Sequence, residues 1–134
     1  MIDIQEQQKL FLAIAEKLPR RVTAYAIGGT AMMLLGKKAA TLDIDIVFVS
    51  EEDRFFFKEV ALSLGNKPID TVKIYGQRKD APIMIEVDNA RIDLFTRNVI
   101  GVQFSDNMMR RAEQTHQFHD NLIIHPANIH DIII

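Results

Sequence analysis

Asp43 and Asp45 stand one residue apart in the apolar segment LDIDIVFV, residues 42–49. Its β-branched and aromatic residues predict a strand. Because side chains alternate between the two faces of a strand, both aspartates project on one side, about 6.6 Å apart, whereas Leu42 and Ile44 project on the other side, into the core. Two carboxylates this close repel each other and raise one pKa unless a cation lies between them. The pair therefore predicts a site for a hard divalent ion such as Mg²⁺.

A third carboxylate occurs in a similar setting further along the chain. Asp93 lies between Ile92 and Leu94 in the segment RIDLFT, residues 91–96, which also predicts a strand. If the two strands are neighbours, Asp93 can lie on the same face as the first pair. Three carboxylates can hold two metal ions about 3.5 to 4 Å apart, an arrangement that serves phosphoryl transfer.

A glycine pair precedes these strands. Gly28 and Gly29 connect the predicted strand VTAYAI, residues 22–27, to a short helix. Without side chains, such a turn lets a phosphate approach the backbone and the N–H groups at the start of the helix, and Thr30 adds a hydroxyl donor. A phosphate on this turn and metal ions on the aspartates would together bind a nucleoside triphosphate.

Each feature also has an ordinary structural explanation. A Gly-Gly pair between a strand and a helix is more often only a tight turn, and Asp-x-Asp in a strand is commonly a solvated sheet face. The ordered combination favours a functional site: a glycine turn, a helix, Asp-x-Asp on the next strand, and later an aspartate between apolar residues.

The elements that must position these residues follow from periodicity and from start and stop signals. Their order is helix, strand, helix, strand, helix and then a run of strands, which predicts an α+β fold with one mixed β-sheet flanked by helices. A capping box at Ser50 and Asp53 begins the third helix, and Gly65 ends it. The predicted helices cover residues 3–18, 28–36, 50–64 and 105–118, and the predicted strands cover 22–27, 42–49, 71–76, 82–87, 91–96 and 121–125, with a hairpin turn at 88–90.

Composition sets the broad class. The 134 residues are 48% hydrophobic and 25% charged, which predicts one globular domain over residues 1–134. A net charge of -2 gives no global positive field, so it neither supports nor excludes an RNA substrate. The absence of cysteine excludes disulfides and thiolate metal sites. Without a cleavable leader or an apolar run of about 20 residues, we expect a cytoplasmic protein that does not enter a membrane.

The motifs resemble those of the polymerase-β-type nucleotidyltransferase superfamily. That pattern is an apolar residue with Gly-Gly or Gly-Ser, then two acidic residues that alternate with apolar ones, then an acidic residue between apolar ones. This chain offers Ile27-Gly28-Gly29, Asp43-Ile44-Asp45-Ile46 and Ile92-Asp93-Leu94, over roughly residues 20–97. The segments GGTAMMLLGKKAATLDIDIV and FSDNMMRRA further resemble small stand-alone bacterial and archaeal nucleotidyltransferases, some of which belong to toxin-antitoxin or phage-defence systems.

The resemblance implies the nucleotidyltransferase fold, with Mg²⁺ held by Asp43, Asp45 and Asp93. It also implies transfer of a nucleoside monophosphate from a nucleoside triphosphate to a hydroxyl of a protein, RNA or small-molecule acceptor, with pyrophosphate leaving. In that scheme Asp93 is the residue best placed to help deprotonate the acceptor.

The same resemblance implies that the triphosphate binds at the glycine turn, residues 28–30. Lys37, Lys38 and Arg91 are positive groups near the motifs and are candidates for phosphate contacts, although lysines after a helix are usually solvated. His116 and His119 stand three apart on a predicted helix and either ligate a transition metal or form a polar helix face; the absence of an evident third ligand favours the polar face.

One departure from the family pattern opens an alternative. Many relatives continue beyond the sheet into a helical region, whereas this chain stops at HPANIHDIII, so we expect that region to be truncated or absent. A partner subunit or a second copy of the chain would then cover the sheet. The alternative to an enzyme is a non-catalytic nucleotide-binding or toxin-antitoxin interaction module with the same fold.

Overall fold

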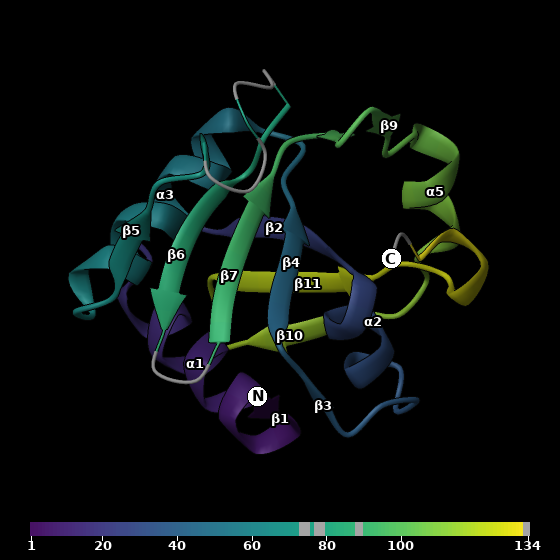
Figure 1. The fold of residues 1–134 in the computed structure, drawn as a ribbon. Helices are drawn as coiled ribbons and strands as arrows, with labels where there is room; N and C mark the ends of the chain where they lie inside the picture. Colours follow the sequence, from purple (N-terminus) through teal and green to yellow (C-terminus); the bar gives the residue numbers. More distant parts are fainter. Residues whose placement is uncertain (73–75, 77–79, 88–89, 133–134) are drawn as a thin grey trace.

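The computed structural model describes residues 1–72, 76, 80–87 and 90–132. At its centre is a mixed sheet of seven strands (Figure 1). The strand order is β10-β11-β2-β4-β7-β6-β5. The strands are β2 Val22–Ile27, β4 Asp43–Val47, β5 Lys67–Ile69, β6 Ile83–Val87, β7 Ala90–Phe95, β10 His116–Phe118 and β11 Leu122–Pro126.

Both parallel and antiparallel pairs occur in this sheet. Strand β4 pairs antiparallel with β2 and parallel with β7, and β11 pairs parallel with β2. Two short pairs lie outside it, β1 Ile2–Asp3 with β3 Ala40–Thr41 and β8 Asn98–Val99 with β9 Val102–Gln103. The α+β class with a mixed sheet is therefore confirmed, and β4 and β7 are direct neighbours.

Helices α1, Ile4–Lys17, and α3, Glu51–Ser63, lie behind the sheet in the view of Figure 1. Helix α2, Gly28–Leu34, packs against β4 on the side nearer the viewer. A short helix α5, Asp106–Arg111, and a 3-10 turn η1, Ile129–Asp131, follow later in the chain. Among the described residues, no helix has both the length and the apolar character needed to cross a membrane.

The helix signals in the sequence act at the predicted places. Gly65 follows α3 with a left-handed φ of +91°, and the Ser50 side chain accepts a hydrogen bond from the Asp53 N–H at 3.3 Å. The carboxylate of Asp53, predicted to complete a capping box, instead accepts from the Thr23 N–H at 3.2 Å and pairs with Arg20 at 2.9 Å. This carboxylate therefore ties the start of α3 to strand β2.

Two cores stabilise the sheet, one on each face. The larger packs α1 and α3 against the strands and includes Ile44 and Ile92, both fully buried. The smaller lies on the opposite face, around Val47, Phe95 and Phe104. Leu42 was predicted to face the core, but it precedes β4 and is 62% exposed, because the strand begins only at Asp43.

The predicted helix over residues 105–118 is wrong beyond its first turns. Helix α5 ends at Arg111, and β10 follows, paired antiparallel with β11. Tertiary contact overrides local propensity here, because Phe118 packs its ring against Phe11 of α1 with centroids 5.2 Å apart. His116 lies in β10 and His119 has a left-handed φ of 50°, so the two do not share a helix face.

The segment between α3 and β6 also differs from the prediction. Strand β5 pairs with β6 at residues 67–69, where no strand was predicted. Thr71 and Val72, the described start of the predicted strand 71–76, are not in a strand, and residues 73–75 lie outside the described residues. Strands β6 and β7 form the predicted antiparallel pair, although turn residues 88–89 lie outside the described part.

Candidate functional site

The parallel register of β4 and β7 places four polar residues on one face of the sheet. Asp43 lies opposite Arg91, and Asp45 lies opposite Asp93. Neighbouring strands are about 4.8 Å apart, so each pair is in direct reach. The structure therefore brings together all three aspartates that the sequence singled out, and it adds Arg91 at the fourth position.

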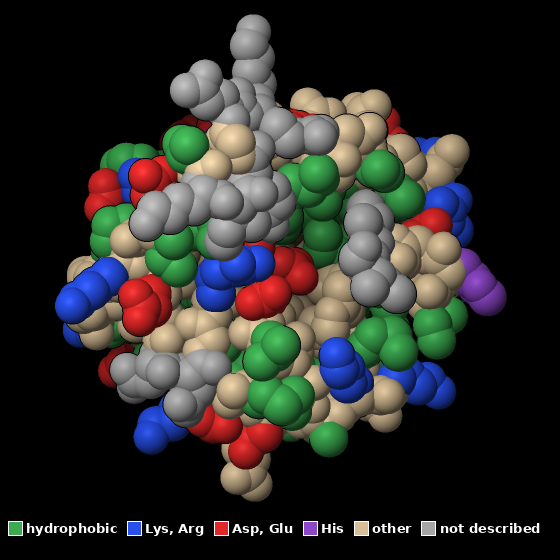
Figure 2. All heavy atoms as spheres, viewed as in Figure 1, with side chains coloured by type: hydrophobic (Ala, Val, Ile, Leu, Met, Phe, Trp, Pro, Cys, Tyr) green, Lys and Arg blue, Asp and Glu red, His purple; other side chains and the backbone are tan. Residues whose placement is uncertain are grey.

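Arg91 holds two of these carboxylates. Its Nε lies 2.9 Å from Asp93 Oδ1, and its Nη2 donates to Asp93 Oδ2 at 3.2 Å and to Asp43 Oδ2 at 3.3 Å. Asp93 is 1% exposed, whereas the Asp43 side chain is 40% exposed. Figure 2 shows basic and acidic side chains side by side over β4 and β7, at the middle of this face. The guanidinium is thus the local counter-ion of a buried carboxylate.

Asp45 is partly buried beside two other carboxylates, which disfavours its charged form. Burial, and then the negative charges of Asp93 and Asp43, raise the pKa of its carboxyl to about 7 against the opposing charge of Arg91. The contribution of Asp43 is the like-charge repulsion that the Asp-x-Asp spacing predicted, although burial contributes most. A positive ion beside Asp45 would favour its charged form.

The glycine turn lies directly beside Asp45. Ile27, the last residue of β2, is the register partner of Asp45, so the next residues turn away next to this carboxylate. The buried Thr30 hydroxyl oxygen accepts a hydrogen bond from the Asp45 N–H at 3.0 Å. This bond links α2 to the strand that carries the aspartates, which is a positioning contact that the sequence did not predict for Thr30.

Backbone geometry explains why the turn contains glycine. Gly28 has a φ of +56°, a left-handed conformation that favours glycine. A Cβ on Gly29 would lie 3.0 Å from Thr41 Cβ and 3.3 Å from Lys38 Nζ. Thr41, a residue that the sequence analysis missed, also donates its hydroxyl to the Asp43 carbonyl at 2.9 Å. In the sequence, this role could be suspected only because Thr41 carries a hydroxyl and lies two residues before Asp43.

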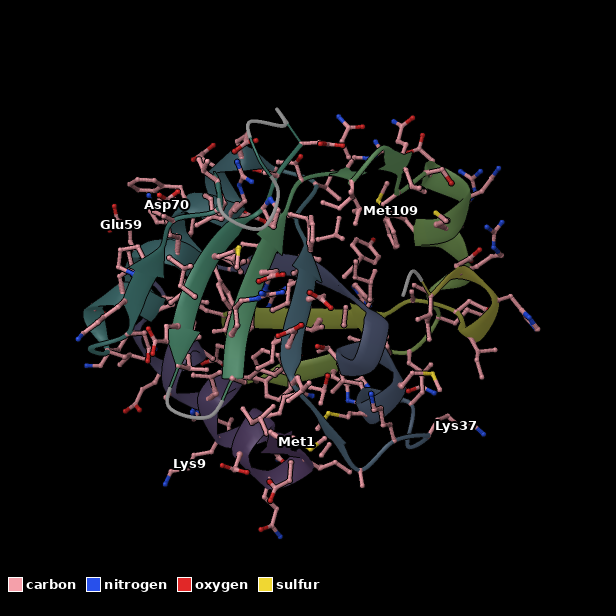
Figure 3. The ribbon with its side chains drawn as sticks, in the orientation of Figure 1. Met1, Lys9, Lys37, Glu59, Asp70 and Met109 are labelled. Carbon is pink, nitrogen blue, oxygen red and sulfur yellow. The ribbon has the colours of Figure 1, made fainter. Side chains whose placement is uncertain are left out.

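The two candidate lysines differ in position. The ammonium group of Lys38 lies next to the backbone of Gly29, as the distance to a Cβ built there shows. Lys37 points away from the sheet into solvent (Figure 3). Lys38 therefore places a positive charge at the glycine turn, whereas Lys37 does not.

Whether a metal ion can bind to the three aspartates depends on the position of Arg91. No three His, Cys, Asp or Glu side chains in the described part of the chain are grouped as metal ligands. The position of Arg91 accounts for this, because its guanidinium takes up oxygens of Asp43 and Asp93. The donor set still fits a hard divalent ion, since three carboxylates carry more negative charge than one guanidinium balances. Arg91 must release at least one carboxylate before such an ion can bind.

Comparisons with known proteins bear on the fold. No protein-family model matches the sequence, and no curated protein matches it. A solved structure, that of the antibiotic-resistance factor ANT(2'')-Ia, matches with a TM-score of 0.51 and 17% sequence identity. The match covers 89% of this chain and 61% of that one, so the chain spans less than two thirds of its neighbour's length. That neighbour is a nucleotidyltransferase, and the chain described here has the nucleotidyltransferase fold.

Proposed function

We propose that this chain is a Mg²⁺-dependent nucleotidyltransferase that moves a nucleoside monophosphate from a nucleoside triphosphate to a hydroxyl of a protein, RNA or small-molecule acceptor. The observation that carries the proposal is the register of three strands. It sets Asp45 opposite Asp93 on one side and opposite Ile27, the residue before the glycine turn, on the other. The carboxylates and the glycine turn thus meet at one place.

Asp43, Asp45 and Asp93 are the residues that would hold Mg²⁺, which when bound neutralises charge on the triphosphate and orients it. Asp93 is buried and is gripped by Arg91 through both carboxylate oxygens, so its orientation is fixed by the protein. After Arg91 has released one of these oxygens, Asp93 would be placed to accept the proton of the acceptor hydroxyl. Arg91 keeps the strongly acidic face folded before substrate arrives.

The glycine turn binds the phosphates in this proposal. Gly28 is buried and Gly29 is partly buried beside Thr41, so a phosphate would approach at Gly29, where the Lys38 ammonium supplies a positive charge. The Thr30 hydroxyl oxygen is already an acceptor for the Asp45 N–H, and its own proton remains to be donated. Its main contribution is then to fix the distance between the turn and the carboxylates.

A second candidate function is favoured by one observation. Arg91 contacts two of the three carboxylates, and no metal-ligand group exists among the described side chains. A chain in which Arg91 stays in place binds a nucleotide or a protein partner without turnover. This is the non-catalytic or toxin-antitoxin interaction module that the sequence left open.

The first experiment measures binding by calorimetric titration of ATP, GTP, CTP and UTP, with and without Mg²⁺. Asp45→Asn and Asp93→Asn keep side-chain size while removing charge, and Asp120→Asn, at an exposed turn position, is the matched control. We expect Mg²⁺-dependent affinity to fall by about tenfold or more in the first two variants, since each loses a charge-assisted contact. The control should bind as the wild type does.

The second experiment separates the two candidates. Nucleoside triphosphate labelled at the α- or the γ-phosphate is incubated with total RNA, a protein extract or a polyhydroxylated small molecule. Transfer of the α-label alone, lost in Asp45→Asn and Asp93→Asn, supports the transferase. Mg²⁺-dependent binding without transfer supports the nucleotide-binding module, and no nucleotide binding to the folded wild type contradicts the transferase and leaves only the protein-interaction module.

A further inference from the structure

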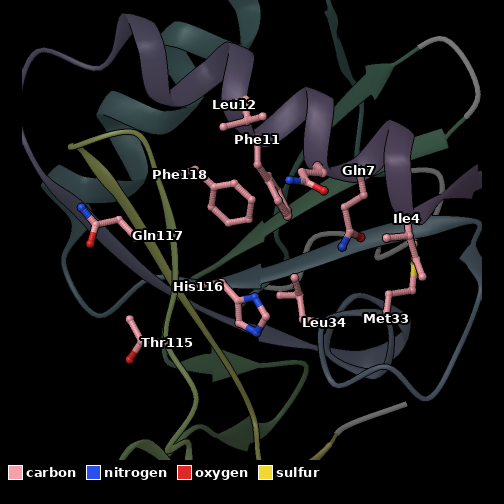
Figure 4. Close-up of a pocket in the computed structure, with 11 residues that line it drawn as sticks. Ile4, Gln7, Phe11, Leu12, Met33, Leu34, Thr115, His116, Gln117 and Phe118 are labelled. Carbon is pink, nitrogen blue, oxygen red and sulfur yellow. The ribbon is translucent and has the colours of Figure 1, made fainter.

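A cavity of about 440 Å³ lies at the opposite end of α2 from the glycine turn. Its walls come from α1, from the last residues of α2, Met33 and Leu34, and from residues 115–118 at and just before β10 (Figure 4). This volume is within the range of about 300 to 1,000 Å³ typical of small-molecule sites. None of its lining residues belongs to the carboxylate site, so it is a separate place in the fold.

Gln7 of α1 is the unusual residue of this cavity. It is 2% exposed, and its side-chain Oε1 has no hydrogen-bond partner among the described residues. Figure 4 shows its amide directed from α1 into the space bounded by Leu34 and His116. An unpartnered buried carbonyl oxygen costs about 1 to 3 kcal/mol. A buried polar group left without a partner beside a cavity is typical of a binding site and not of a core position.

The charge of the lining restricts the ligand. Among the described residues, no Asp, Glu, Lys or Arg lines the cavity, although charged residues make up 25% of the chain. Burial and the nearby His125 lower the pKa of His116, so its imidazole is uncharged at neutral pH. A charged ligand, including a nucleoside triphosphate, would find no counter-ion here.

Aromatic rings form the part of the wall next to Gln7. Phe11 and Phe118 meet at a centroid distance of 5.2 Å with an interplanar angle of 61°. Phe11 is fully buried and Phe118 is 6% exposed, so both rings are held in place by the core. They support the wall from behind, and the apolar surface that a ligand can reach comes from the less buried lining side chains of Ile4, Leu12 and Leu34. The nearby amide of Gln7 offers one donor group and one acceptor.

We propose that this cavity binds a small, uncharged molecule with a carboxamide- or lactam-like edge, which pairs with the side-chain amide of Gln7 and packs against Leu12 and Leu34. An amide edge matches Gln7 because each partner has an N–H donor beside a carbonyl acceptor. Rotation about the last bond of the Gln7 side chain, a torsion with broad preference, turns Oε1 toward the ligand. This proposal uses no nucleotide chemistry, so its test is independent of the transferase.

Benzamide and N,N-dimethylbenzamide are the probes, because they share a ring and a carbonyl but only benzamide has N–H donors. Each is titrated into the ¹⁵N-labelled full chain while amide shifts in α1 and β10 are followed by NMR. We expect saturable benzamide shifts there, and a dimethyl analogue that binds about tenfold more weakly, the loss that one hydrogen bond produces. Equal binding of the two, or no saturable shift in α1 and β10, overturns the proposal.

Gln7→Met removes the amide at nearly constant length, and Gln5→Met on the same helix, at an exposed position outside the cavity, is its control. Because Gln7→Met removes an unsatisfied polar atom, the ligand-free variant should melt at or above the wild-type temperature, while benzamide affinity falls about tenfold. Gln5→Met should leave affinity unchanged. Unchanged benzamide affinity in folded Gln7→Met would also overturn the proposal. If Gln7→Met fails to fold, the comparison of the two probes on the wild type decides alone.

Discussion

At Asp45 the folded chain holds a carboxyl whose pKa is raised from 3.8 to about 7, chiefly by burial. Between these values the folded state binds a proton that the unfolded state has released. Stability from this group is therefore fully present below about pH 4 and is lost as the pH rises toward 7. Urea unfolding at several pH values, in the presence of a chelator, should therefore include a decrease in the free energy of unfolding between about pH 4 and 7.

Asp45→Asn tests the source of that pH dependence. The amide does not titrate, so the fall between about pH 4 and 7 should become smaller in this variant. Asp120→Asn, at an exposed position, should keep the wild-type slope. The explanation fails if Asp45→Asn shows the same slope as the wild type. In the proposed transferase, Mg²⁺ should flatten the wild-type slope too, because it favours the charged carboxyl.

The carboxylates could be predicted from sequence and the role of Arg91 could not, for a physical reason. Alternation along one strand places Asp43 and Asp45 on the same face whatever the rest of the fold does. Arg91 contacts Asp43 from 48 residues away, and this contact depends on the register between β4 and β7. A shift of one residue in that register would turn Arg91 to the other face.

At the scale of elements, the turn from β2 into α2 depends on a close approach at Gly29. Gly29→Ala would press its Cβ against the Thr41 hydroxyl oxygen, the nearest atom, with Thr41 Cβ at 3.0 Å, and it should destabilise the chain by about 1 to 3 kcal/mol. Thr41→Ala in the same chain should recover part of this loss in urea unfolding, because it removes the crowding hydroxyl and methyl. Gly36→Ala is the control, since nothing lies within 4 Å of its added Cβ and its cost comes from a φ of +74°. If Thr41→Ala also restored the stability lost in Gly36→Ala, crowding between residues 29 and 41 would not be the cause.

Elements with strong local signals were predicted well, and those set by distant contacts were not. Helix α1 and strand β7 occupy almost the predicted residues, since the apolar periodicity of each is clear. The segment after Arg111 has helix-compatible residues, but β10 forms because the edge of β11 and the ring of Phe11 are available to it. Neither partner can be identified from the local sequence.

At the scale of the whole molecule, β11 joins the outer strand β10 to the middle of the sheet. Ile124 in β11 is fully buried in the larger core, so Ile124→Ala should lower the free energy of unfolding by about 2 to 5 kcal/mol. Ile129, which is 48% exposed, is the control, and Ile129→Ala should change it by no more than about 0.5 kcal/mol. Equal effects of the two in urea unfolding would mean that β11 is not part of the cooperative unit.

The parallel pairing of β11 with β2 also has a consequence for synthesis of the chain. Val22 donates its N–H to the Asn121 carbonyl at 2.7 Å, and Asn121 donates to the Leu18 carbonyl across 103 residues. During translation, β2 leaves the ribosome long before the strand that covers its edge. The nascent chain therefore exposes a hydrophobic strand edge until residue 126 has emerged, and over that interval it is a natural client for chaperones.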